Sequence, residues 1–170
     1  MSAAKENTKS INLSLLTVVL LLLVVVIWVG IRLVFPDSST ILAGMRPENL
    51  GIREGKLLSC PTTPNCVSSQ STDAEHTIEP LTYQSSTTEA IANLKSIIQS
   101  QERAKIIAET DNYLYAEFAS HWMGFVDDVE FYANEATEKI DVRSASRLGE
   151  SDLGVNRQRV ESIRNQLKSF

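Results

Sequence analysis

The sequence holds few residues of the kinds that bind metals. Its 170 positions include two cysteines and two histidines, His76 and His121. It contains no HExxH motif, no paired CxxC motif, no GxSxG motif and no phosphate-binding glycine loop. We therefore expect no metal and no cofactor, favour structural roles for both histidines, and assign no catalytic residue.

Positive charge is also scarce. Lysine and arginine number 16 against 21 aspartates and glutamates, the net charge is -5, and no basic stripe is present. Nucleic-acid binding depends on concentrated Lys and Arg that release counterions from phosphates, so we expect no nucleic-acid partner. The length allows one domain of ordinary size plus a tail.

Charge is missing altogether from residues 11–31, INLSLLTVVLLLLVVVIWVGI. As a helix with a rise of about 1.5 Å per residue, this run spans the hydrocarbon layer of about 30 Å. A cleaved signal peptide would have an apolar region of only about 7–15 residues and a small-residue cleavage site. The lipoprotein-like box LLSC at 57–60 lies far beyond the run. We predict a cytoplasmic tail over 1–10 and a transmembrane helix over 11–34.

The two cysteines lie in the loop SCPTTPNCVSS, where Pro61 and Pro64 stiffen the path between Cys60 and Cys66. In a membrane-anchored protein this pair predicts a disulfide in an oxidising compartment. A redox pair and a metal pair are the alternatives; the first favours a two-residue spacing and the second needs two further ligands.

The orientation of the helix follows from the cysteines, because flanking charge is nearly balanced. The flanking basic residues are Lys5 and Lys9 before the helix and Arg32, Arg46 and Arg53 after it. We expect a single-pass protein with the amino terminus in the cytoplasm and the C-terminal domain in the periplasm or a lumen. The membrane would be the plasma membrane or, in a photosynthetic source, the thylakoid membrane.

The remaining sequence predicts an α+β domain. Residues 35–59 have scattered Pro and Gly and no sustained period, which indicates an extended linker before a domain over 60–170. Ser86 and Glu89 form a capping box that begins a helix ending near Gln101. Two hairpins follow, and a last helix is capped by Asn156. We expect a four-stranded antiparallel sheet with two helices on one face, and a weak edge strand over 76–83.

The second hairpin concentrates polar side chains. A tight turn at Glu135 and Ala136 would set Val129 opposite Val142 and Phe131 opposite Ile140. The same register places Asp128 opposite Arg143 on the outer face and Asp127 opposite Ser144 on the inner face. A buried Asp127 needs a partner, for which Arg147 or the donors of loop 149–154 are candidates. Accordingly, we expect Asp127→Ala to destabilise more than Asp128→Ala.

Three stretches resemble a known family: CPTTPNCVSS, FVDDVEF and RSASRLGESDLGVNRQRVE. They are similar to the uncharacterised bacterial and plastid family called domain of unknown function 1499, from about Cys60 to Leu167. The resemblance implies the boundary of the domain and an association with membranes or cell envelopes, including those of photosynthetic organisms. It supplies no catalytic residues.

The polar residues allow two interpretations. One is a scaffold of cross-strand ion pairs around a buried carboxylate. The other is a pocket in which Arg147, Arg157 and donors at the start of the last helix hold an anion, such as a carboxylate or a lipid head group. A glycosidase-like pair is disfavoured because adjacent strand residues face opposite sides. The candidate ligand-binding residues are Asp127, Arg143, Arg147, Asp152, Asn156 and Arg157.

We conclude from the sequence that the chain is a membrane-anchored, non-catalytic binding or interaction domain of the cell envelope. Its expected partners are the lipid bilayer and either another membrane or envelope protein or an anionic ligand. The alternatives are a small envelope enzyme that uses Asp127 as a general base on a lipid or cell-wall substrate, and an assembly or scaffolding factor. An exposed Trp122 would indicate partner contact.

Overall fold

The computed structural model describes residues 13–35 and 40–170. These residues divide into two units, one that holds helix α1 (Leu13–Val34) and one that begins near residue 40. Among the described residues, α1 is the one helix long and apolar enough to cross a membrane, a property that a signal sequence shares. The predicted apolar helix is thus present. Its first two positions and the predicted tail lie outside the described residues.

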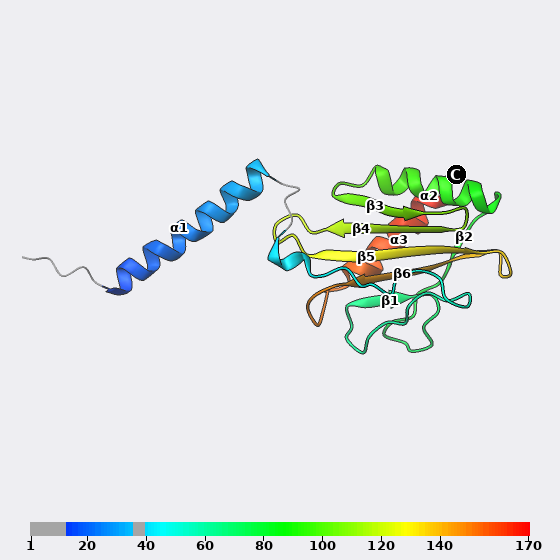
Figure 1. Cartoon of the computed structure of the whole chain (residues 1–170), viewed down its shortest axis with the longest axis horizontal. Helices are drawn as coiled ribbons and strands as arrows, with labels where there is room; N and C mark the ends of the chain where they lie inside the picture. Colours follow the sequence, from blue (N-terminus) through cyan, green and yellow to red (C-terminus); the bar gives the residue numbers. More distant parts are fainter. Residues whose placement is uncertain (1–12, 36–39) are drawn as a thin grey trace, which may run out of the picture. The chain divides into compact units, whose positions relative to one another are not determined.

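The second unit, here called the body, is built on one antiparallel sheet (Figure 1). The strand order is β1-β6-β5-β4-β3, and β2 also pairs with β6. The strands are β1 Cys66–Ser68, β2 Leu81–Thr82, β3 Ala104–Glu109, β4 Tyr113–Ala119, β5 Val126–Asn134 and β6 Lys139–Ser146. The four longer strands are the two predicted hairpins. Of the two short strands on β6, β2 lies within the weak edge strand expected over 76–83, and β1 was not predicted.

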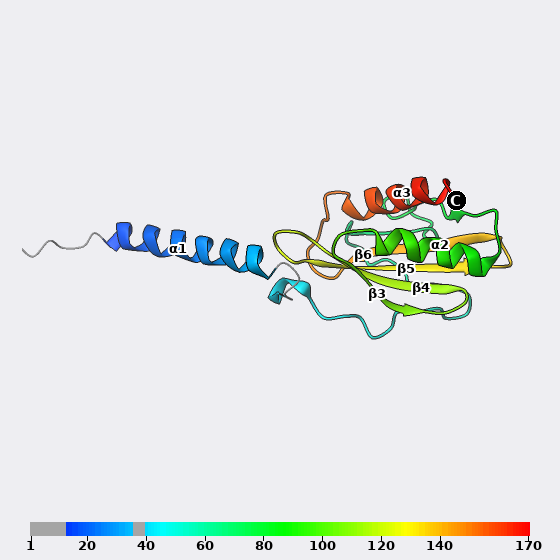
Figure 2. The ribbon, with the colours of Figure 1, turned by 90° about the horizontal axis from the view of Figure 1, so that it is seen from above.

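Both body helices cover the same face of the sheet (Figure 2). α2 spans Thr87–Gln99 and begins as predicted, with the Ser86 side chain accepting a hydrogen bond from the Glu89 backbone N–H at 3.3 Å. α3 spans Val155–Leu167. Their apolar stripes pack on the sheet and form the main core, whose fully buried members include Leu94, Ile98, Leu114, Phe131, Ile140, Val142 and Val160. The predicted α+β architecture is therefore confirmed.

Residues 40–59, here called the covering segment, pack on the opposite face of the sheet. Figure 2 shows this segment across the sheet from α2 and α3. It begins with the short 3-10 helix η1 (Ile41–Ala43). Its Leu57 forms a second small core with Tyr113 and Tyr115, packed against Leu50, Ile52, Ile107 and Tyr132. The extended linker predicted for 35–59 is therefore not what residues 40–59 form.

The register of the second hairpin differs from the prediction by two residues. Val129 pairs with Ser144 and Phe131 with Val142, because the strands continue to Asn134 and Lys139 before the chain turns. The tight turn that we predicted is thus a longer loop. Since the shift is even, every side chain keeps the predicted face. Asp127 now lies opposite Ser146, and Asp128 opposite Ala145.

Two glycines in the covering segment test how closely it packs. Gly44 and Gly51 both have positive φ, so alanine at either position introduces backbone strain of about 1–3 kcal/mol. A Cβ at Gly44 would also lie 2.9 Å from Arg147 Cβ, whereas one at Gly51 would meet nothing within 4 Å. We expect Gly44→Ala to lower the free energy of unfolding more than Gly51→Ala, as measured by urea denaturation. Equal losses would contradict close packing of the segment on the sheet.

Candidate functional site

The six candidate residues are divided between the two faces of the sheet. Arg143 and Arg147 lie on the face beneath the covering segment: Arg143 stands opposite Glu130, and Arg147, the residue after β6, is paired with Asp128. Asp127 and Asn156 lie on the helix face. The remaining two, Asp152 and Arg157, lie at the start of α3. The fold therefore does not gather the six into one pocket.

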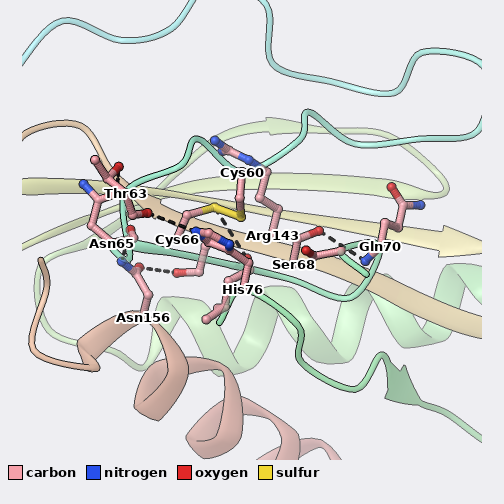
Figure 3. Close-up of a disulfide and its surroundings, with 12 residues drawn as sticks. Cys60, Thr63, Asn65, Cys66, Ser68, Gln70, His76, Arg143 and Asn156 are labelled. Carbon is pink, nitrogen blue, oxygen red and sulfur yellow. Dashed lines mark hydrogen bonds between the residues drawn. A yellow bond between two sulfur atoms is a disulfide. The ribbon is translucent and has the colours of Figure 1, made fainter. Parts of the chain in front are cut away.

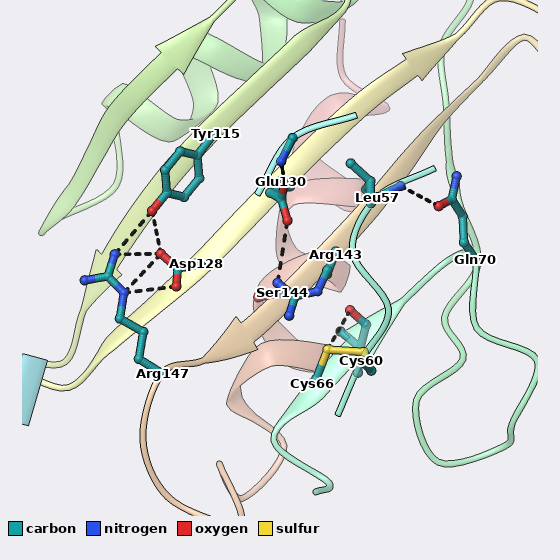
Figure 4. Close-up of polar contacts among 12 residues, drawn as sticks. Leu57, Cys60, Cys66, Gln70, Tyr115, Asp128, Glu130, Arg143, Ser144 and Arg147 are labelled. Carbon is teal, nitrogen blue, oxygen red and sulfur yellow. Dashed lines mark hydrogen bonds and ion pairs between the residues drawn. A yellow bond between two sulfur atoms is a disulfide. The ribbon is translucent and has the colours of Figure 1, made fainter. Parts of the chain in front are cut away.

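Asp128 is the centre of a charged cluster on the covered face (Figure 4). Its carboxylate, with 2% of the side chain exposed, accepts hydrogen bonds from Arg147 Nη2 at 2.6 Å and Nε at 2.9 Å. The Tyr115 hydroxyl donates to the same carboxylate at 2.5 Å. Arg147 Nη2 also donates to Glu117, whose carboxylate accepts a further hydrogen bond from Arg46 at 2.6 Å. Two arginines thus balance two carboxylates.

The pKa values in this cluster follow from burial and pairing. Burial alone would lower the pKa of the Arg147 guanidinium, but its hydrogen bonds to Asp128 and Glu117 outweigh burial and raise that pKa. Burial raises the pKa of the Tyr115 hydroxyl, and its hydrogen bond to Asp128 adds to the effect. The cluster therefore holds its arginine charged and its tyrosine neutral at physiological pH.

A second buried ion pair joins Glu130 and Arg143 in the neighbouring row (Figure 4). Glu130 is fully buried, and its Oε1 accepts hydrogen bonds from Gly51 N at 2.7 Å and from the Tyr113 hydroxyl at 2.8 Å. Its Oε2 lies 3.5 Å from Arg143 Nη1, beyond ordinary hydrogen-bond length. Burial lowers the pKa of the Arg143 guanidinium, while Glu130 acts to raise it. The hydrogen bond from Gly51 to Glu130 ties the covering segment to the sheet.

Asp127 takes its partner from α3. Its Oδ2 accepts a hydrogen bond from Arg159 Nη2 at 2.5 Å, and the guanidinium also stacks 4.8 Å from the centre of the Phe118 ring. The need for a partner was predicted correctly, but its identity was not: Arg147 lies on the other face. The sequence feature that could have identified Arg159 is its position on α3, four residues and so one helical turn after Val155.

Asn156 is fully buried and connects three segments. Its Oδ1 accepts from Ser144 Oγ at 2.6 Å, and its Nδ2 donates to Asn65 O and Ser146 Oγ, both at 3.0 Å. The prediction that Asn156 caps the last helix is wrong. Gly154 occupies the N-cap, and the Asp152 carboxylate accepts a hydrogen bond from the Asn156 backbone N–H at 2.7 Å.

Two arginines of α3 hold the chain that precedes α2. Arg157 donates to Thr77 O at 2.8 Å and to Glu75 O at 3.0 Å, and Arg164 donates to Pro80 O and Glu79 O at 2.7 and 2.6 Å. Arg157 is therefore bonded to backbone carbonyls. An anion that bound Arg157 would compete with these contacts.

The disulfide between Cys60 and Cys66 is formed as predicted (Figure 3). Closing so short a loop contributes about 2 kcal/mol of stability by restricting the unfolded chain. His76 packs beside this loop, with Nδ1 2.9 Å from the Asp73 carboxylate and Nε2 3.1 Å from Thr63 O. Two acceptors facing one imidazole favour its doubly protonated form. His76 therefore has the structural role that we expected.

The arrangement favours a structural role for these residues over catalysis or ligand binding. Each carboxylate of the clusters, Glu117, Asp127, Asp128 and Glu130, has an arginine partner. Sequence reasoning missed Arg46, Glu117, Glu130 and Arg159. For Glu130 the signal was its position two residues after Asp128, on the same face of β5. Glu117 lies opposite Asp128 through the pairing of β4 with β5, which the sequence pattern did not fix. Arg46 gave none, because the covering segment has no periodic pattern.

The two aspartates differ in burial, which reverses the order of effects expected from sequence. Asp128→Ala leaves a buried guanidinium and a buried hydroxyl without their main acceptor, so we expect a loss of about 3–5 kcal/mol. Asp127 and Arg159 are more exposed, with 12% and 13% of their side chains accessible. We expect Asp127→Ala to cost about 1–3 kcal/mol. Chemical denaturation measures both, and a larger loss for Asp127→Ala would reject this assignment.

His76 gives the disulfide loop a pH dependence. The Thr63 carbonyl and the Asp73 carboxylate raise the pKa of His76 above its ordinary 6.5, and His76 lowers the pKa of Asp73 to about 2. The contribution of His76 is thus full below pH 6.5 and lost as pH rises through the raised value. The contribution of Asp73 is lost only as pH falls from 3.8 towards 2.

We therefore expect the stability difference between the native chain and His76→Gln to be largest near pH 5 and to shrink towards pH 9. Urea denaturation of the two chains across this range measures the difference. A difference that stays constant from pH 5 to pH 9 would show that His76 is not charged in the folded state.

Comparison with protein families places most of the body in one of them. A family model described as "Protein of unknown function (DUF1499)" matches residues 56–167. No curated protein matches the chain. The matched region begins inside the covering segment and ends at the last residue of α3, so it contains the disulfide and all six candidate residues.

Proposed function

Since the chain belongs to the DUF1499 family of proteins of unknown function, we propose that its body is a non-catalytic interaction domain held at a membrane by α1. The polar residues of the body support this proposal by their pairing. Asp127, the candidate general base, is hydrogen-bonded to Arg159 and mostly buried. A general base must lie within hydrogen-bond reach of the substrate proton, and this carboxylate is occupied by the arginine instead.

The observation that carries the proposal is an exposed apolar surface at one end of the sheet, here called the end patch. It consists of Ile41, Met45, Trp122, Met123 and Leu148. Ile41 and Met45 are 94% and 91% exposed, and Trp122 is 57% exposed. Large exposed apolar patches mark protein–protein or membrane interaction sites.

Three segments far apart in the sequence build the end patch. Thr40 Oγ1 donates to Met123 O at 3.1 Å, which fixes η1 beside the β4–β5 connection. Gly44 packs against the Leu148 side chain, with the position of a Cβ only 3.1 Å from Leu148 Cγ. Figures 1 and 2 both place η1 at the end of the sheet where β4 turns into β5. The patch is therefore built by the same packing that closes the covered face.

The disulfide supports an extracytoplasmic position for the body, because cytosolic thiols are kept reduced. In this arrangement the amino terminus lies in the cytoplasm and the body in the periplasm or a lumen. The membrane is that of a cell envelope or thylakoid. A role in assembling a membrane complex uses the same end patch and remains the second candidate.

Anchoring is tested on membranes from cells that produce the full chain. We expect the mature protein to keep residues 13–34 by mass spectrometry and to stay in the membrane pellet at alkaline pH. In spheroplasts, added protease should digest the body and spare a cytoplasmic marker. A mature chain that begins after residue 34, or a body that protease does not reach, would overturn the proposed topology.

A further inference from the structure

The end patch holds most of the large apolar side chains that the body leaves exposed. Its closeness to α1 along the chain points to the ligand that covers it. Phe35, the residue after α1, is five residues before Thr40. Five residues reach at most about 18 Å when fully extended. If α1 spans a bilayer, Thr40 and the loop bonded to it stay within that distance of the end of the span.

The composition of the end patch suits the interfacial layer of a bilayer. Tryptophan is enriched where lipid head groups meet acyl chains, because its ring is apolar and its N–H is polar. Trp122 lies beside His121, with ring centres 4.7 Å apart, and next to Met123. The other members, Ile41, Met45 and Leu148, are wholly apolar side chains that gain by leaving water.

Charge around the patch favours neutral lipid over anionic lipid. Arg46, the residue after Met45, is paired with Glu117, and Arg147, before Leu148, is paired with Asp128. Glu150, two residues after Leu148, is exposed and adds negative charge. A surface with its cations occupied and a carboxylate at its rim attracts anionic head groups weakly. Burial of apolar surface is therefore the main attraction.

We infer that the end patch rests in the interfacial layer of the membrane that holds α1, with zwitterionic or neutral lipid as its ligand and Trp122 within the head-group region. This inference rests on the proposed anchoring and adds a second attachment of the body to the bilayer. It makes the body a domain that lies against its membrane.

The experiment places the full chain in phosphatidylcholine nanodiscs. The sequence has two tryptophans, Trp28 and Trp122, so Trp28→Phe leaves Trp122 as the single tryptophan. Nanodiscs are prepared with ordinary lipid and with lipid brominated near the top of the acyl chain, a quencher that acts at short range. We expect blue-shifted emission, loss of most of it in brominated lipid, and no change at high salt.

Two variants in the Trp28→Phe background test whether the quenching requires the end patch or only a body held close to the bilayer. Met45→Glu should restore the emission in brominated lipid. Phe170→Glu replaces an exposed apolar side chain at the carboxyl end, which Figures 1 and 2 place at the other end of the body from η1. It should leave the quenching unchanged.

The outcomes separate the inference from the proposed anchoring. A chain that does not co-elute with nanodiscs refutes the anchoring itself. A chain that co-elutes but shows red-shifted Trp122 emission, quenched by aqueous iodide and not by brominated lipid, refutes the lipid contact alone. That result would assign the end patch to a protein partner.

Discussion

The sheet of this protein carries charge on a face that is buried, and the rest of the body depends on how that charge is paired. Three carboxylates, Glu117, Asp128 and Glu130, lie beneath the covering segment and are paired with Arg143 and Arg147 beside them and with Arg46 of the segment itself. An unpaired charge at these positions would cost several kcal/mol. The face is therefore stable only when the covering segment supplies Arg46 and the Gly51 amide and excludes water.

The covering segment links this pairing to function. Its first residues are held against the β4–β5 connection by Thr40 and against Leu148 by Gly44, and these contacts assemble the end patch. Arg147, one of the two arginines that suggested an anion site, is thus part of the frame that presents an apolar surface. In this account the buried polar residues hold the covering segment in place on the sheet, and the exposed apolar residues of the end patch bind the partner.

The sequence predicted the features that neighbouring residues determine and missed those that depend on contacts between segments far apart in the chain. The Ser86 N-cap, the β3–β4 hairpin and the cysteine pair are local, and all three are present. The predicted register of β5 and β6 was wrong by two residues, because the alternation of side chains fixes the face of Ala133 but not the residue opposite it. The covering segment was missed because its contacts with Glu130 and Glu117 span 79 and 71 positions without any period.

Hydrogen exchange at the Gly51 amide tests the closed face most directly. This amide donates to buried Glu130 at 2.7 Å, although Gly51 lies in a segment without regular secondary structure. If the covering segment is part of the folded body, Gly51 N–H exchanges as slowly as the amides of β5 and opens with them. Exchange at the rate of an unstructured chain, with β5 still protected, would contradict the account.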